Sequence, residues 1–253
     1  MASFTRQLLG LLLGLGICAA QSKPELIIGA AANLTQTFQS LGPAFEAETG
    51  IHPVFSFAST AQLTQQAEAG APFDLILAAD TEHMEQLERE GLLLPASRTA
   101  YAQGSVALWI PAGSKFGVKG ITELTSPEIR VIAIAKPELA PYGAAAVAAL
   151  KRVGIWNQVA SKVVYAENIN MARQYGALQN ADAVFTAYSL VRNASGTVIQ
   201  LDPALYPPIQ QSLGILARAE HPAAARKFVD FLLRGRGREL LLRDGYLAPA
   251  RSF

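Results

Sequence analysis

Apolar runs rich in Val, Ile and Phe alternate with segments of helical periodicity along most of this chain. The runs that we predict as strands are 25–30, 53–57, 73–78, 105–110, 130–135, 162–165, 183–186 and 213–217. The predicted helices are 34–48, 61–69, 81–90, 142–153, 171–179, 222–234 and 236–244. Strands that alternate with helices in this way are typical of an α/β fold, in which mainly parallel sheets are flanked by helices.

Four of the predicted strands break into a short turn of small or polar residues and then lead directly into a helix. These junctions lie at 27–33, 55–60, 132–142 and 163–169. Each junction places unpaired backbone N–H groups and the positive end of a helix at the carboxyl edge of a parallel sheet. Several such helix ends that meet at one cleft would bind a small anion without any charged side chain.

One residue at each junction is a candidate ligand contact. Asn33 offers a side-chain amide, Thr60 offers a hydroxyl group, and Tyr142 offers a phenol at the start of its helix. Ile169 can contribute only its backbone N–H group. Each residue also has an ordinary structural interpretation, because Asn33 and Thr60 would cap their helices. Tyr142 and Ile169 would pack in the core.

The segment 1–20 has the pattern of a secretory signal peptide. Arg6 precedes an apolar run that is too short to span a bilayer, and small residues follow up to Ala20, after which we predict cleavage. Cys18 would be a site of lipid anchoring, but lipoprotein signals have a small residue before the cysteine, and here that residue is Ile17. Removal of 1–20 leaves equal numbers of basic and acidic residues and no cysteine, so we expect a soluble periplasmic protein.

The length of the chain suits one large domain or two lobes. The proline-rich stretch 201–208 is predicted to be a stiff connection, because proline cannot donate a hydrogen bond to a sheet. The apolar run after it would return the chain to the first lobe, and the stretch 101–104 would be the outgoing crossing. We therefore predict one lobe from 21–103 plus 211–253 and a second lobe from 104–210.

The composition argues against two classes of function. The 21 basic and 20 acidic residues give a net charge of +1, without the clustered Lys and Arg of a nucleic-acid-binding surface. The sequence contains no G-x-S-x-G, H-E-x-x-H or P-loop motif, and its three histidines lie far apart. We therefore expect no enzymatic activity, no cofactor and no nucleic-acid partner.

Several motifs together resemble those of the periplasmic molybdate-binding proteins, which are the substrate-binding components of ABC importers. These motifs are AAANL at 30–34, FSFASTAQL at 55–63, EAGAPFDLILAAD at 68–80, KPELAPYG at 136–143, ENI at 167–169 and FVDFL at 228–232. The resemblance covers essentially the whole chain after the predicted signal peptide. It implies a two-lobe periplasmic-binding-protein fold of type II, in which α/β lobes close over a ligand in the cleft.

The resemblance also implies the ligand and the residues that hold it. The ligand would be molybdate or tungstate, bound as the oxyanion by Asn33, Thr60, Tyr142 and Ile169, without a direct bond from the protein to the metal. The protein would deliver this ligand to an inner-membrane ABC permease. We expect it to act as a monomer.

Tyr188 is a fifth candidate. Some members of the resembled family place a ligand-contacting tyrosine at the end of a strand, and ungapped alignment puts Ala187 at that position, with Tyr188 one residue later. A shift of one residue along a strand reverses the direction of the side chain. The sequence therefore leaves open whether Tyr188 reaches the ligand.

Three alternatives stay open at this point. The same fold could bind another oxyanion or a small organic anion, because residue types alone do not give the radius of the cavity. A hydrolase or transferase on an α/β scaffold would need a nucleophile–base pair, and none is visible in the sequence. An iron site would need paired tyrosines, and Tyr188 has no adjacent tyrosine.

Overall fold

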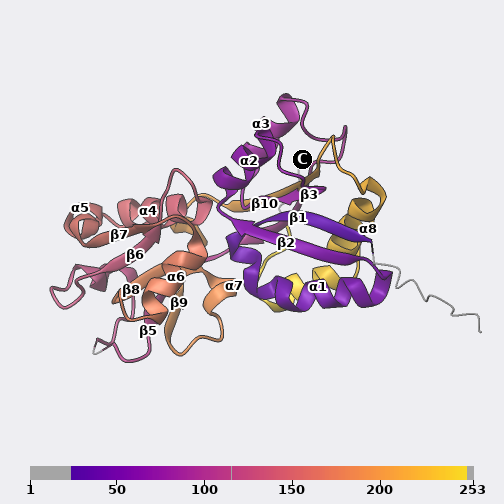
Figure 1. The fold of residues 1–253 in the computed structure, drawn as a ribbon. Coiled ribbons are helices and arrows are strands. Elements are labelled where there is room, and N and C mark those ends of the chain that lie inside the picture. Colours follow the sequence, from indigo (N-terminus) through magenta and orange to yellow (C-terminus); the bar gives the residue numbers. More distant parts are fainter. Residues whose placement is uncertain (1–23, 115, 250–253) are drawn as a thin grey trace, which may run out of the picture.

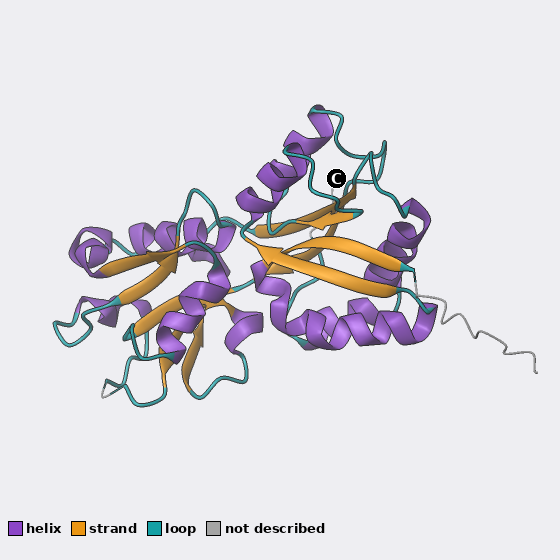
Figure 2. Ribbon diagram, in the orientation of Figure 1, coloured by secondary structure: helices purple, strands orange, loops and turns teal. Residues whose placement is uncertain are grey.

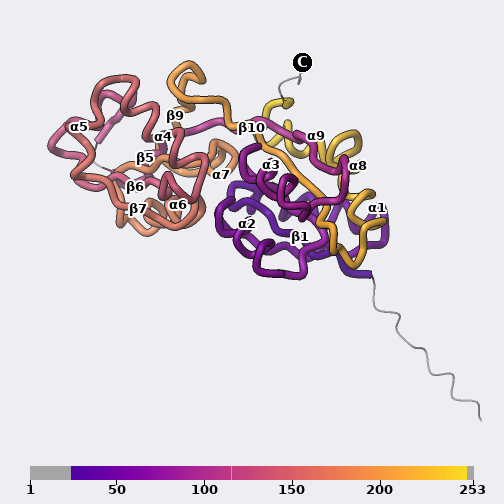
Figure 3. The backbone as a smooth tube through the Cα atoms, turned by 90° about the horizontal axis from the view of Figure 1, so that it is seen from above, coloured from indigo at the N-terminus to yellow at the C-terminus, as the bar shows by residue number. Residues whose placement is uncertain are grey.

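The computed structural model describes residues 24–114 and 116–249, which form two lobes. Each lobe is built on one five-stranded sheet. Figures 1 and 3, which are viewed from directions 90° apart, show the two lobes side by side. The first and last parts of the chain form one lobe, and the middle of the chain forms the other. The predicted signal peptide, with Cys18, lies outside the described residues.

The sheet of the first lobe has the strand order β2-β1-β3-β10-β4. β1 pairs in parallel with β2 and β3, whereas β10 is antiparallel to both of its neighbours. The strands are β1 (Glu25–Ala31), β2 (His52–Ala58), β3 (Leu75–Leu77), β4 (Thr99–Gly104) and β10 (Ile209–Ile215).

The sheet of the second lobe has the order β7-β6-β8-β5-β9. β6 pairs in parallel with β7 and β8, whereas β5 is antiparallel to β8 and β9. The strands are β5 (Val106–Pro111), β6 (Ile132–Ala135), β7 (Val163–Ala166), β8 (Ala183–Ala187) and β9 (Gly196–Gln200).

In each sheet one strand runs opposite to the others, and it is the strand by which the chain enters that lobe. Only Ser105 separates β4 from β5. The return path, residues 201–208, contains one turn of 3-10 helix, η4 (Pro203–Leu205), and leads into β10. Because β4 includes Gly104 and β10 begins at Ile209, the first sheet extends one or two residues past the lobe limits predicted from the sequence. Those limits stay a prediction.

Helices flank both sheets, as Figure 2 shows. Around the first sheet lie α1 (Thr35–Thr49), α2 (Thr60–Glu68), α3 (Glu82–Arg89), α8 (Pro222–Arg234) and α9 (Arg236–Arg243). Around the second lie α4 (Pro141–Arg152), α5 (Trp156–Val159), α6 (Ile169–Ala177) and α7 (Tyr188–Val191). Short 3-10 turns are η1 (Ala32–Leu34), η2 (Ile121–Thr125) and η3 (Ala160–Lys162). No helix within the described ranges is long and apolar enough to cross a lipid bilayer.

An apolar stripe along α1 packs in the core of the first lobe. Phe38 and Phe45 are almost fully buried, and both rings meet Phe228 of α8 edge-on, at centroid distances of 6.1 and 5.0 Å. Edge-to-face aromatic pairs of this kind are stabilising beyond the area that they bury. Gly50 caps the C-terminal end of α1, where it adopts φ 73° and donates its N–H to the carbonyl of Glu46.

The predicted strand pattern is wrong at three places. β4 and β9 are absent from the prediction, and β10 covers 209–215 where the sequence indicated 213–217. β4 has the sequence TAYAQG, which offers little apolar alternation, and β9 is an edge strand whose side chains are partly or fully exposed. Pairing with neighbours far along the chain, rather than local pattern, determines these strands.

Candidate functional site

All four predicted strand-to-helix junctions are present as helix starts. The turn after β1 is η1, and α2, α4 and α6 start at Thr60, Pro141 and Ile169. The N-terminal residues of these helices follow backbone in an extended or polyproline-like conformation, as at Ser59 with φ −68° and ψ 157°. The first N–H groups of each helix have no acceptor within the helix. Each start therefore offers donors to whatever lies in front of it.

The helix starts of the two lobes meet at the interface between the lobes. At the α2 start, the N–H of Ala61 donates to the carbonyl of Leu139, just before α4, at 3.3 Å. The side chain of Gln62 donates to Glu167, just before α6, at 3.2 Å. The η1 turn contacts α6 directly. The positive ends of helices from both lobes therefore surround one region.

Thr60 is 1% exposed, and its hydroxyl oxygen accepts a hydrogen bond from the N–H of Ala79 at 3.0 Å. Ser59 takes the capping position instead, and its N–H and hydroxyl both donate to Gln62 Oε1, at 3.1 and 2.8 Å. The sequence left open whether Thr60 caps its helix, and the structure assigns the cap to Ser59. Because a hydroxyl has one hydrogen and two lone pairs, the bond from Ala79 leaves the Thr60 hydrogen able to donate.

Asn33 is 1% exposed and lies in the η1 turn. Its side-chain amide nitrogen donates to Gln211 Oε1 at 3.1 Å and to the Tyr246 hydroxyl at 2.9 Å. The carbonyl of Asn33 accepts from the Tyr246 hydroxyl at 2.8 Å, and the Ser189 hydroxyl of the second lobe lies 3.3 Å from it. Both amide hydrogens therefore have protein partners, and in this conformation the backbone N–H groups of η1 are the donors that remain for an anion.

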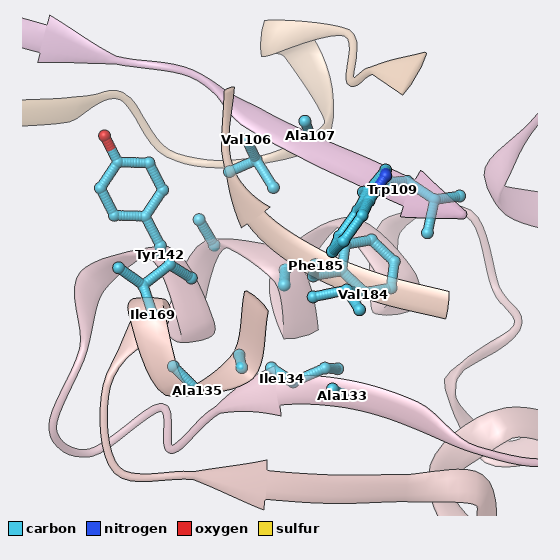
Figure 4. Packing of buried hydrophobic residues seen from close by; sticks show 14 of the residues in the cluster. Val106, Ala107, Trp109, Ala133, Ile134, Ala135, Tyr142, Ile169, Val184 and Phe185 are labelled. Carbon is cyan, nitrogen blue, oxygen red and sulfur yellow. The ribbon is translucent and has the colours of Figure 1, made fainter. Parts of the chain in front are cut away.

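Tyr142 is 2% exposed, and its hydroxyl oxygen accepts from Gln211 Nε2 at 2.9 Å. Burial raises the pKa of Tyr142 well above its ordinary value, so the phenol stays protonated. In Figure 4 the ring extends from the α4 start with its hydroxyl end pointing away from Ile169. Pro141 occupies the first position of α4, and the N–H of Tyr142 is the first that this helix presents.

Ile169 is 4% exposed and packs in the same apolar cluster as Tyr142, together with Ala31 and Ala32 of the first lobe. Asn168 caps α6 by accepting from the N–H of Met171 at 2.9 Å, which leaves the N–H of Ile169 facing out of the helix start.

Tyr188 is half-buried and is the first residue of α7. Because β8 ends at Ala187, the reversal that applies along a strand does not determine the direction of this side chain. Its ring lies against Gly245 of the first lobe, where an added Cβ would be 2.7 Å from the ring. Contact between Tyr188 and a ligand stays a prediction.

Four buried polar residues complete the interface and were not among the candidates from the sequence: Tyr101, Ser189, Gln211 and Tyr246. The Tyr101 hydroxyl donates to Gln211 Oε1 at 2.7 Å, and burial raises the pKa of both Tyr101 and Tyr246. Gln211 gives no local signal, because it lies between two other polar residues, Gln210 and Ser212, in β10. Tyr246 lies after the last helix, where no pattern indicates burial.

An open groove of about 490 Å³ between the lobes carries several of the ionisable side chains near the site. Its lining includes Asp80, Glu82 and His83 of the first lobe and Glu138 of the second. The hydrogen bond that the His83 ring donates to the Asp80 carboxylate raises the pKa of His83. By contrast, the four candidates from the helix starts are buried and uncharged. No cluster of His, Cys, Asp or Glu among the described residues could hold a metal ion. The helix starts thus offer an anion neutral hydrogen-bond donors and helix dipoles.

Residues 26–247 match the family described as bacterial extracellular solute-binding protein. The chain is 33% identical over 240 residues to the molybdate-binding protein ModA of Rhodobacter capsulatus, which covers 94% of each chain. It is 35% identical over 248 residues to the molybdate-binding protein ModA of Azotobacter vinelandii, which covers 96% of this chain and 98% of that protein.

The fold is similar to that of solved binding proteins. The periplasmic molybdate-binding protein of Azotobacter vinelandii superposes with a TM-score of 0.83 at 27% identity, over 89% of this chain and 100% of that one. The sulfate-binding protein SubI of Mycobacterium tuberculosis shares the fold with a TM-score of 0.75 at 16% identity, over 88% of this chain and 86% of that one.

Proposed function

Because this chain belongs to the molybdate-binding proteins of the bacterial extracellular solute-binding family, we propose that it captures molybdate or tungstate between its lobes and passes the oxyanion to an ABC permease. The observation that carries this proposal is the meeting of four helix starts from both lobes around one region, with uncharged residues at each start. Its relatives are transport proteins, and the chain is accordingly a binding protein rather than an enzyme.

The proposed binding mode uses the backbone more than the side chains. N–H groups at η1 (Asn33), α2 (Thr60), α4 (Tyr142) and α6 (Ile169) would replace the water around a tetrahedral dianion, and the Thr60 hydroxyl would add a donor. Bonds to a charged acceptor are stronger than neutral ones, and the helix dipoles favour negative charge, so no cation needs to be buried with the ligand. Donors from two lobes would stabilise the closed arrangement, which a permease can recognise.

Calorimetric titration of ligand-free protein with molybdate, tungstate, sulfate and phosphate tests this function. We expect tight binding of one molybdate or tungstate per chain and no heat from sulfate or phosphate, because the two larger oxyanions would fill the cavity. Binding of sulfate or phosphate instead would be consistent with the fold but would contradict the assignment of molybdate or tungstate as the ligand. A folded protein that binds none of the four would contradict the proposal.

Replacing Thr60 with alanine should weaken molybdate binding by about 1–3 kcal/mol, because one donor to a charged acceptor is lost. The same change also removes the acceptor of the Ala79 N–H, so thermal stability should fall as well. Calorimetry on the folded variant separates the two effects. T60S keeps the hydroxyl and should restore most of the affinity.

Thr64 provides a matched control for this variant. It lies one turn further along α2, is 3% exposed, and donates its hydroxyl to the carbonyl of Thr60 at 3.1 Å. T64A therefore removes a buried hydroxyl from the same helix without removing a donor at its start. If T60A and T64A bind molybdate equally well, Thr60 is not a ligand contact.

The family places the protein outside the cytoplasm. We propose in addition that residues 1–20 are removed as a signal peptide, that the lobes divide at 103/104 and 210/211, and that the protein acts as a monomer. Mass determination of the exported protein and its size in solution test the first and the last of these.

A further inference from the structure

Gln211 lies on β10 and is fully buried, with 0% of its surface exposed. Its side-chain oxygen accepts from Tyr101 at 2.7 Å and from Asn33 at 3.1 Å, and its side-chain nitrogen donates to Tyr142 at 2.9 Å. With two donors at the oxygen and an acceptor at the nitrogen, the amide has one orientation that satisfies all three bonds.

These bonds join two of the helix starts. Asn33 belongs to η1 of the first lobe, and Tyr142 belongs to α4 of the second. Gln211 itself sits on the strand by which the chain returns to the first lobe. The pairing of β10 with β4 shifts register between Gln211 and Ser212, and irregularities of this kind redirect a side chain. One buried amide thus connects the donors that the two lobes would present to one ligand.

Gly104 provides the space that the Tyr142 hydroxyl occupies. It ends β4, the strand that leads to the second lobe and pairs with β10 through Ile209. A Cβ at residue 104 would overlap the Tyr142 hydroxyl and would lie 2.7 Å from Gln211 Nε2. The Tyr142 hydroxyl therefore lies against the two strands that carry the chain between the lobes. On β4, Gly104 leaves room for it, and on β10, Gln211 donates a hydrogen bond to it.

We propose that Gln211 is the positioning residue of the oxyanion site: by holding Tyr142 and Asn33 together, it fixes the α4 start against the η1 turn in the arrangement that binds ligand. This inference rests on the proposed function. Gln211 does not touch the ligand in this scheme. It acts through the Tyr142 ring, which holds the first turn of α4, and through the Asn33 amide, which holds η1.

A double-mutant cycle with Q211L and Y142F tests the inference, with molybdate affinity measured by calorimetry and folding by thermal denaturation. Each single change breaks the bond between Gln211 and Tyr142 and should weaken molybdate binding about 10-fold, as expected for a lost buried hydrogen bond. The double variant should have the same molybdate affinity as whichever single variant binds molybdate less tightly, because both changes act through one contact. A general loss of stability would not produce this non-additivity.

Gln103 supplies the control, since it is a partly buried glutamine on the neighbouring strand β4. Q103L should keep the affinity of the unaltered protein. Wild-type affinity in Q211L, or losses in Q211L and Y142F that multiply in the double variant, would overturn the inference. If Q211L does not fold, wild-type affinity in Y142F overturns it equally. Failure of the unaltered protein to bind molybdate would reject the proposed function instead.

Discussion

Replacing Asp74 with alanine is expected to lower the free energy of unfolding by about 2–4 kcal/mol, because it leaves two backbone N–H groups without their charged acceptor. Asp74 is 2% exposed. Its carboxylate accepts from the N–H of Ile27 at 2.9 Å and from the N–H of His221 at 2.7 Å. These bonds tie the loop before β3 to β1 and to the start of α8, which are far apart in the sequence.

The second lobe contains a matched site that sets the scale of this effect. Asp182 precedes β8 as Asp74 precedes β3, and its carboxylate accepts from the N–H of Arg130 at 2.8 Å and of Val131 at 2.9 Å. Asp182 is only half-buried, so in D182A water can replace part of the hydrogen bonding that the two N–H groups lose. We expect D182A to cost about 1–2 kcal/mol, less than D74A.

Urea unfolding followed by circular dichroism and by tryptophan fluorescence would measure both variants. The two tryptophans, Trp109 and Trp156, lie in the second lobe. Fluorescence therefore reports that lobe, whereas circular dichroism reports both. D74A should lower the midpoint seen by circular dichroism more than D182A does. A D74A variant as stable as the unaltered protein, or one less affected than D182A, would show that these bonds do not hold the first lobe together.

The helix starts could be predicted from the sequence because their signals are local. A run of β-branched residues followed by a small or capping residue determines where a strand ends and a helix begins, and four such junctions appear within a few residues of their expected positions. The Tyr142 phenol was likewise visible as a polar group at a helix start. Its acceptance of a hydrogen bond from Gln211 was not, because the two residues are 69 positions apart.

The correspondence between Asp74 and Asp182 is likewise a feature that the sequence alone does not reveal. In each lobe the aspartate N–H donates to a backbone carbonyl, that of Ile27 in β1 or of Val131 just before β6, and the N–H of the same residue donates back to the carboxylate. The residues around them, PFDLIL and ADAVF, share little beyond the aspartate. The repeated element is a hydrogen-bond pattern between strands, and such a pattern leaves no periodic signal in the sequence.

Gly143 shows how the backbone can limit the geometry of the proposed site. It is the third residue of α4, and a Cβ there would overlap the carbonyl oxygen of Ala135, at the end of β6. That oxygen belongs to the main chain of a central strand and cannot turn aside. In G143A the first turn of α4 must therefore move away from β6, and the N–H groups of this turn move with it.

We expect G143A to weaken molybdate binding by about 100-fold, since the N–H groups of Gly143 and Ala144 already donate to the carbonyl of Ala140 and the displaced turn therefore carries away the donor that remains for the charged ligand, the N–H of Tyr142. Overpacking of this kind also lowers stability by about 1–3 kcal/mol. Calorimetry and thermal denaturation on the same preparation would measure the two effects. Gly117 is exposed and has nothing within 4 Å of an added Cβ, so G117A is the matched control and should change neither quantity. If G143A binds molybdate as tightly as G117A does, the α4 start takes no part in binding the ligand.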